Sequence, residues 1–204
     1  MNPLEIFGVI TLGYVLGAIP VGVVASRWLA GVDPRQVGSR NIGFTNVLRV
    51  AGTTAGIVTL LGDMGKGAAA VLAAHIILSS GSEDWALAAG GAAILGHLFP
   101  IFLRFKGGKG VATALGVFLA LDPILGGSLV LIWLSSAVLW RTSSLAAIVA
   151  FGSLPVITWI RHPHPVMLAF ALGVTALIAY RHAENIRRLL AGTEPKFRAR
   201  PNPS

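Results

Sequence analysis

The sequence predicts an all-α integral membrane protein with seven transmembrane helices. Of its 204 residues, 54% are hydrophobic and 12% are charged, and the mean hydropathy is +0.76. A soluble domain carries about 25% charged residues, so an ordinary soluble domain is excluded. The net charge of +8 is common in nucleic-acid-binding domains, but an apolar chain belongs in lipid, so we expect no nucleic-acid partner. The absence of cysteine excludes disulfides and thiolate metal sites.

The first predicted span covers residues 6–26, a run of 21 residues without a charge. About 20 mainly apolar residues are enough to cross the hydrocarbon core. The preceding segment contains Glu5 and no basic residue, unlike the basic start of a cleavable signal peptide. We therefore expect this helix to remain in the protein, with the N-terminus outside.

Six further uncharged runs are candidates for the later spans. They lie at 67–82, 85–103, 110–121, 123–140, 142–160 and 162–180. The run 110–121 is short and is followed by a predicted tight turn at Asp122 and Pro123, so six spans remain possible if this hairpin is re-entrant. The apolar segment 50–61 has only 12 residues, which is typical of a re-entrant or interfacial helix, and we place it at the cytoplasmic face.

The basic residues support this topology. It places every one of the 16 Lys and Arg residues except Arg161 on the inside, as the positive-inside rule requires. The C-terminus is then cytoplasmic. We expect one membrane-embedded domain over residues 1–191, followed by a short polar cytoplasmic tail over residues 192–204.

Four polar clusters interrupt the apolar sequence, and the predicted topology brings all four to the cytoplasmic face. They are GSRNIGFTNVLR at 38–49, GDMGKG at 62–67, GHLFPIFLRFKGGKG at 96–110 and YRHAENIRRL at 180–189. Cations, amides and hydroxyls gathered on one side of a small membrane protein are typical of a site for anionic substrates.

The glycine-rich segment 106–110 predicts a phosphate loop. Gly107, Gly108 and Gly110 allow backbone N–H groups to converge on an anion, and Lys106 and Lys109 add positive charge. A helix beginning near Gly110 would add its N-terminal dipole. A basic, flexible loop that only sets the topology explains the same residues equally well.

The first cluster contains the side chains that suit a polyol phosphate. Ser39 and Asn41 are able to hydrogen-bond hydroxyls, and the guanidinium of Arg49 suits a phosphate. We favour a functional role for Ser39 and Arg49. Thr45 and Asn46 fit a ligand contact and a turn or helix cap equally well.

Two histidines are predicted where helices meet the cytoplasmic face. A histidine exchanges protons readily near neutral pH, which makes His97 and His182 candidate site residues. Asn185 follows His182 by three residues, so the two side chains share a helix face. The same spacing predicts that Asp63 and Lys66 form a pair in the second cluster.

Taken together and in this order, the clusters resemble the bacterial acyl-phosphate-dependent glycerol-3-phosphate acyltransferases. The matching text runs from GSRNIGFTNVLR through GDMGKG and GHLFPIFLRFKGGKGVATALG to YRHAENIRRLLAGTEPK, over positions 38–196. Against the family pattern, Arg40 and Phe44 stand where Gly or Lys and Ala are common. The resemblance implies a multi-pass enzyme of the bacterial cytoplasmic (inner) membrane, with its active site facing the cytoplasm.

The resemblance also implies the reaction and the site. A fatty acyl group passes from acyl phosphate to the 1-hydroxyl of sn-glycerol 3-phosphate, giving lysophosphatidate and phosphate. The partners it implies are these two substrates and membrane lipids, with no cofactor and no metal. The resemblance matches His182 and Asn185 to the family's catalytic pair and Ser39 and Arg49 to essential positions. We predict Ser39, Lys109, His182 and Asn185 as catalytic. Those assigned to substrate binding are Asn41, Arg49, His97, Lys106, Gly107, Gly108 and Gly110, and Glu194 matches an acid of the family.

The residues leave three questions open. Either His182 or the departing phosphate could accept the proton of the attacking hydroxyl. A covalent acyl intermediate on Ser39 is the enzymatic competitor of direct transfer. A small phosphate or anion permease is the alternative from another class, although it would need polar residues throughout the bilayer.

Overall fold

The computed structural model describes residues 2–78 and 83–197, and in these ranges the regular elements are all helical. Residues 79–82 of the predicted run 67–82 lie outside the described residues, as do residues 198–204 of the predicted tail, with Arg198 and Arg200. The elements are α1 (Pro3–Ala18), α2 (Val21–Ala30), α3 (Phe44–Ile77), α4 (Glu83–Leu98), the 3-10 turn η1 (Ile101–Leu103), α5 (Val111–Leu121), α6 (Pro123–Trp140), α7 (Ser143–Arg161), α8 (Pro165–Arg181) and α9 (Ala183–Leu190).

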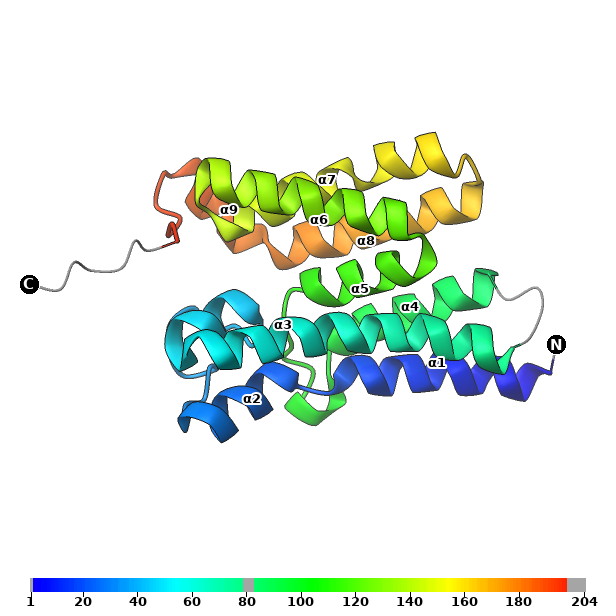
Figure 1. Ribbon diagram of the computed structural model, residues 1–204, viewed down its shortest axis with the longest axis horizontal. Helices are drawn as coiled ribbons and strands as arrows, with labels where there is room; N and C mark the ends of the chain where they lie inside the picture. Colours follow the sequence, from blue (N-terminus) through cyan, green and yellow to red (C-terminus); the bar gives the residue numbers. More distant parts are fainter. Residues whose placement is uncertain (1, 79–82, 198–204) are drawn as a thin grey trace, which may run out of the picture.

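The helices form two groups that lie side by side along their length (Figure 1). In the first group α1 packs mainly on α4, and α3 packs on α5 and α2; in the second α7 packs on α6 and α8. The groups meet where α5 contacts α6 and α4 contacts α8. The described chain begins and ends at opposite ends of the bundle (Figure 1).

Glycines let α1 approach α4 closely, as the spacing of Gly13 and Gly17 suggests. A Cβ added to Gly13 would overlap the carbonyl oxygen of Ala89, and one added to Gly17 would overlap that of Ala93. Neither position leaves room for a methyl group. The two helices therefore touch backbone to backbone. The same holds at Gly96, next to His97, where an added Cβ would overlap the carbonyl oxygen of Tyr14.

Five helical segments of the described chain are long and apolar enough to cross a membrane, and α8 with α9 adds a sixth if that pair, bent by 63°, is one span. The predicted runs 123–140, 142–160 and 162–180 correspond closely to α6, α7 and α8. With 11 residues, α5 would span about 16 Å, roughly half the hydrocarbon core. The molecule is therefore an all-helical membrane protein, and seven remains the predicted number of spans.

The prediction of a separate short helix over 50–61 is wrong. This segment is part of α3, a helix of 34 residues that continues through Asp63 and Lys66. Their charges seemed to separate two segments, but the side chains form an ion pair of 2.8 Å within the helix. The interruption in α3 lies instead at Gly52, whose φ of 87° and ψ of 176° are not helical.

The first predicted span is also interrupted. The uncharged run 6–26 is divided between α1 and α2 at Ile19 and Pro20, and α2 continues past Arg27 to Ala30. Pro20 has no backbone N–H to continue the hydrogen-bond ladder. The carbonyl oxygen of Ile19, which lies outside both helices, accepts a hydrogen bond of 3.0 Å from the ammonium of Lys66. A side chain of α3 thus supports the break between α1 and α2.

Candidate active site

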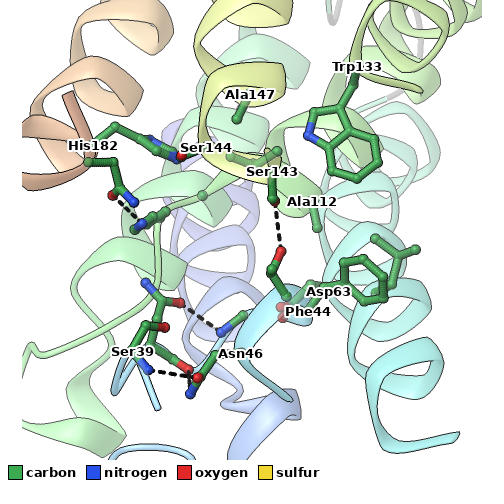
Figure 2. Close-up of a pocket in the computed structure, with 18 of the residues that line it drawn as sticks. Ser39, Phe44, Asn46, Asp63, Ala112, Trp133, Ser143, Ser144, Ala147 and His182 are labelled. Atoms are coloured by element: carbon green, nitrogen blue, oxygen red, sulfur yellow. Dashed lines mark hydrogen bonds between the residues drawn. The ribbon is translucent and has the colours of Figure 1, made fainter. Parts of the chain in front are cut away.

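A cavity of about 240 Å³ lies between the two helix groups, and it collects most of the predicted site. Figure 2 shows Ser39 and His182 on one side of it and Trp133 on the other. Of the predicted site residues, the cavity is lined by Ser39, Asn41, Arg49, His97, Lys109, Gly110, His182 and Asn185. Lys106, Gly107 and Gly108 do not line it. The cavity thus brings together predicted residues that are up to 146 positions apart in the chain.

The cavity has two chemically different parts. The side chains above supply a polar part, to which Arg188 and Glu194 contribute. Leu60 and Met64 of α3, Leu115 of α5, and Val130, Trp133 and Leu134 of α6 supply an apolar part. One continuous site therefore suits a ligand that has both an anionic group and a hydrocarbon chain.

Asn46 organises the loop before α3 (Figure 2). Its Oδ1 accepts a hydrogen bond of 2.9 Å from the backbone N–H of Ser39, and its Nδ2 donates to the carbonyl oxygens of Pro34 and Asn41, both at 2.9 Å. The side chain is 2% exposed. Asn46, whose role the sequence left open, is therefore the residue that holds Ser39 at the cavity.

The structure shows the surroundings of Arg40 and Phe44, the two residues that depart from the family pattern. Arg40 has a positive φ of 56°, a conformation that glycine adopts without strain. This explains physically why a glycine suits the position. Phe44 begins α3 and lines the cavity. Its side chain is larger than that of alanine, so it narrows the cavity at this point.

The glycine-rich loop packs against the end of α4. The backbone N–H of Gly107 donates to the carbonyl oxygen of Leu98 at 3.2 Å, and that of Gly108 to the carbonyl oxygen of His97 at 3.1 Å. The expectation that these two N–H groups converge on a phosphate is therefore wrong, because the end of α4 has unpaired carbonyls that they satisfy. Among the three glycines of this loop, Gly110 alone has a positive φ, 84°, where it precedes α5.

Arg181 fixes this loop from the second helix group. Its Nη2 donates to the carbonyl oxygen of Gly107 at 2.8 Å, and its Nε donates to that of Gly108 at 3.0 Å. The guanidinium also lies over the ring of Phe99, 5.7 Å from its centroid. Arg181 was not predicted as a site residue, and its only sequence signal is that it precedes His182.

Glu194 connects the last cluster to α7. One carboxylate oxygen accepts hydrogen bonds of 2.6 Å from Ser144 Oγ and from Asn185 Nδ2, and the other accepts one of 2.7 Å from Arg188 Nε. Burial alone would raise the pKa of Glu194, but these donors outweigh it and hold the pKa below its ordinary value. The residue is therefore a carboxylate that orients Asn185.

Asn185 in turn accepts a hydrogen bond from the ammonium of Lys109. Burial lowers the pKa of Lys109 to about 8, although the nearby charge of Glu194 opposes the shift. Lys109 is thus still mostly a cation at pH 7. Glu194, Asn185 and Lys109 form a chain of contacts that ends with a positive charge at the cavity.

His182 lies between α8 and α9 and outside both helices. Its Nδ1 is 2.8 Å from the carbonyl oxygen of Ile178, so Nδ1 carries the proton and Nε2 is left as an acceptor. Burial, reinforced by the charge of Lys109, lowers the pKa of His182 to about 4. The ring is therefore neutral at pH 7.

Sequence reasoning did not single out three other residues of the cavity wall. Ser143 and Ser144 begin α7, and Arg188 lies three residues after Asn185. Ser143 Oγ is 2.8 Å from Thr45 Oγ1, which joins α7 to α3 across the cavity (Figure 2). The spacing of Arg188 was a usable signal, but nothing local marks the two serines.

Comparison with known proteins places the chain in a family. The family model described as glycerol-3-phosphate acyltransferase matches residues 7–192. The chain belongs to the glycerol-3-phosphate acyltransferase family. It is 44% identical to the glycerol-3-phosphate acyltransferase of Syntrophotalea carbinolica, over 91% of this chain and 94% of that one. It is 49% identical to the enzyme of Caulobacter vibrioides, over 91% of this chain and 84% of that one.

Solved structures agree with the sequence family. The crystal structure of PlsY, an integral membrane glycerol 3-phosphate acyltransferase, in its glycerol 3-phosphate form is 40% identical, with a TM-score of 0.88 over 95% of this chain and 96% of that one. Its lysophosphatidic acid form is 38% identical, with a TM-score of 0.84 over 94% of each chain. The chain therefore shares its fold with this PlsY acyltransferase over nearly its whole length.

Proposed function

We propose that this protein transfers a fatty acyl group from an acyl phosphate to the 1-hydroxyl of sn-glycerol 3-phosphate. The observation that carries the proposal is the single cavity that joins a cationic, polar part to an apolar part. Both substrates bring a phosphate, and one brings a hydrocarbon chain. The family membership and the glycerol 3-phosphate form of the similar PlsY structure support the same reaction.

The proposed reaction is a direct transfer. The glycerol oxygen forms a bond to the acyl carbonyl carbon, the bond from that carbon to the phosphate oxygen breaks, and phosphate leaves. Lys109 and Arg49 bind phosphate, and among the described residues no carboxylate forms an ion pair with the guanidinium of Arg49. Ser39 and Asn185 hydrogen-bond the reacting oxygens, which stabilises the developing oxyanion.

The proton passes most easily to the departing phosphate. His182 with a pKa of about 4 accepts a hydrogen bond at Nε2 but is a weak base at pH 7. A phosphate, with a second pKa of about 6, is the stronger proton acceptor. On this proposal His182 orients the attacking hydroxyl, and a variant His182→Ala retains measurable turnover.

We further propose that the acyltransferase crosses the bacterial cytoplasmic (inner) membrane seven times, with membrane lipids around it and its active site facing the cytoplasm. The positions of the basic residues and of the two ends of the described chain support this orientation. The short α5 fits it as well, because the loop before α5 brings Lys109 into the molecule from the cytoplasmic end.

The proposal is tested with purified protein, glycerol 3-phosphate and either palmitoyl phosphate or palmitoyl-CoA as donor. We expect lysophosphatidate from palmitoyl phosphate alone, and its loss in Ser39→Ala. Activity with palmitoyl-CoA alone contradicts the donor assignment, and radiolabelled acyl-protein trapped without glycerol 3-phosphate indicates a covalent Ser39 intermediate. No transfer from either donor, together with phosphate flux in liposomes, indicates the permease instead.

A further inference from the structure

An acid, a base and a histidine are buried together beside the cavity. The side chains of Asp63 and Lys66 of α3 and of His97 of α4 are 2%, 5% and 3% exposed. Asp63 Oδ1 lies 2.8 Å from Lys66 Nζ and 3.5 Å from His97 Nδ1. Burying charged groups among apolar helices is costly, so each member of this cluster requires a reason.

The structure itself gives the reason for Lys66. Its ammonium bonds the carbonyl oxygen of Ile19, where α1 ends before Pro20, and Asp63 neutralises its charge. This structural role accounts for one oxygen of Asp63. It accounts neither for Asp63 Oδ2 nor for His97 Nδ1, both of which are buried without a hydrogen-bond partner among the described residues.

His97 connects this carboxylate with the site. Its backbone carbonyl accepts the N–H of Gly108, and a Cβ added to Gly108 would overlap His97 Nε2. With Nδ1 toward Asp63, Nε2 is the nitrogen on the side of the glycine-rich loop, and the ring lines the cavity. A carboxylate beside Nδ1 favours the tautomer that carries its proton there, which leaves the lone pair of Nε2 free to accept.

We infer that Asp63 is a positioning residue for acyl transfer: it holds His97 in one orientation and tautomer, so that Nε2 accepts a hydrogen bond from glycerol 3-phosphate. The inference rests on the proposed function of the cavity. Asp63 Oδ1 and His97 Nδ1 are 3.5 Å apart, and hydrogen bonds of this kind shorten when substrate binds.

The test must separate positioning from neutralisation of Lys66. Asp63→Asn alone leaves the ammonium of Lys66 buried without a counter-charge, which lowers the melting temperature for structural reasons. The double variant D63N/K66M removes both charges. We expect it to recover most of the melting temperature, while the KM for glycerol 3-phosphate stays raised by about tenfold, the effect of one lost hydrogen bond, and the KM for palmitoyl phosphate does not change.

Asp122 supplies the matched control, since it is a buried carboxylate that also contacts a histidine and a base but lies at the other end of the bundle. Its Oδ2 lies 2.6 Å from Arg161 Nε and from His162 Nε2. D122N is expected to lower the melting temperature and leave both KM values at their wild-type level. A raised KM in D122N as large as that in D63N/K66M overturns the inference, because the effect is then not local to the site.

A second comparison asks whether Asp63 acts through His97. In a His97→Ala background, adding D63N/K66M is expected to change the KM for glycerol 3-phosphate by less than about twofold, because coupled residues are not additive. If the effects of His97→Ala and of D63N/K66M on the KM for glycerol 3-phosphate multiply, the inference is overturned. It is also overturned if D63N/K66M by itself has the wild-type KM. An inactive wild-type protein contradicts the proposed function, whereas an active wild type with a normal double variant contradicts only the role of Asp63.

Discussion

Three hydrogen bonds of the site converge on Glu194. It receives hydrogen bonds from α7, from Asn185 and from Arg188, so its carboxylate fixes three side chains at once. Hydrogen bonds to a charged group contribute more than those between neutral groups. The acid therefore matters for the position of Asn185 although no atom of it has to touch a reacting bond.

The variant Glu194→Gln is expected to lower kcat by at least about tenfold, equivalent to about 1.4 kcal/mol of transition-state stabilisation. The amide keeps the shape but offers one oxygen acceptor in place of two, so Arg188 and Asn185 lose their common partner. Glu184→Gln is the matched control, because the Glu184 side chain is 84% exposed and contacts the same Arg188 at 3.2 Å. Equal losses in the two variants contradict the role assigned to Glu194.

The same residue predicts a pH dependence of stability. Because the pKa of Glu194 is lowered in the folded protein, its carboxylate stabilises the fold above its ordinary pKa of 4.5, and this contribution is lost as the pH falls below that value. Melting temperatures measured from pH 7 down to about pH 3 are therefore expected to diverge below pH 4.5, where the wild type loses stability more steeply than Glu194→Gln. Parallel curves contradict this prediction.

Lys109 predicts an alkaline limit to activity. Its pKa of about 8 means that the free enzyme loses this cation as the pH rises through 8, and with it a phosphate contact. We expect kcat/KM for glycerol 3-phosphate to fall with an apparent pKa near 8, since kcat/KM reports the free enzyme. In Lys109→Arg the cation persists to higher pH, so the alkaline fall is expected to move up or disappear.

At this scale the sequence predicts residue types better than their contacts. Ser39, Arg49, Lys109, His182 and Asn185 all line the cavity, because charge, topology and helical spacing are local properties. The roles of Arg181 and Ser144 depend on partners between 50 and 74 residues away, and no local pattern encodes such contacts. The assignment of the backbone amides of Gly107 and Gly108 to phosphate is wrong for a different reason: the loop folds back on the end of α4, where the carbonyls of Leu98 and His97 accept these amides.

Among the elements, α3 differs most from its prediction. A helix that contains two opposite charges is read from sequence as two segments, but paired charges at positions three apart are compatible with one continuous helix. The start of α6 agrees with its prediction because a helix cap and a proline mark it in the sequence. The helix begins at Pro123, and Oδ1 of the preceding Asp122 accepts the backbone N–H groups of Ile124 and Leu125. Caps and prolines are local signals, whereas a buried ion pair is not.

The conformation of Gly52 gives α3 its break and predicts the effect of a substitution there. With φ 87° and ψ 176°, the residue occupies a region that is essentially restricted to glycine, and a Cβ added to it would meet nothing within 4 Å. Gly52→Ala is expected to cost about 1–3 kcal/mol through backbone strain alone. It is also expected to raise the KM for glycerol 3-phosphate, because the turn with Arg49 lies just before the break.

Gly173 of α8 provides the comparison for this prediction. A Cβ added to it would also meet nothing within 4 Å, but its φ is not positive. Gly173→Ala is therefore expected to be neutral or to stabilise the helix by up to about 1 kcal/mol. If thermal unfolding in detergent shows the same change for both alanine variants, the backbone of Gly52 is not strained by a side chain.

The cavity lies between two helix groups, which also contact each other through α5 and α6 and through α4 and α8. Thr45 and Ser143, Arg181 and the glycine-rich loop, and Lys109 and Asn185 are the polar links between the groups in the described chain. The apolar part of the same cavity lies toward α3 and α6. A substrate with a charged end and a hydrocarbon chain thus fits the boundary between the two groups.

The orientation of the whole molecule is the last prediction, and the absence of cysteine makes it directly testable. Pro163 lies between α7 and α8, Thr193 follows α9, and both are exposed. In right-side-out vesicles, a membrane-impermeant maleimide is expected to label Pro163→Cys, whereas Thr193→Cys reacts only in inside-out vesicles. Each variant is first assayed for acyl transfer, so that only folded protein is compared. The reverse labelling pattern would contradict the cytoplasmic site, and labelling of both cysteines from one side would contradict a crossing of the membrane by α8.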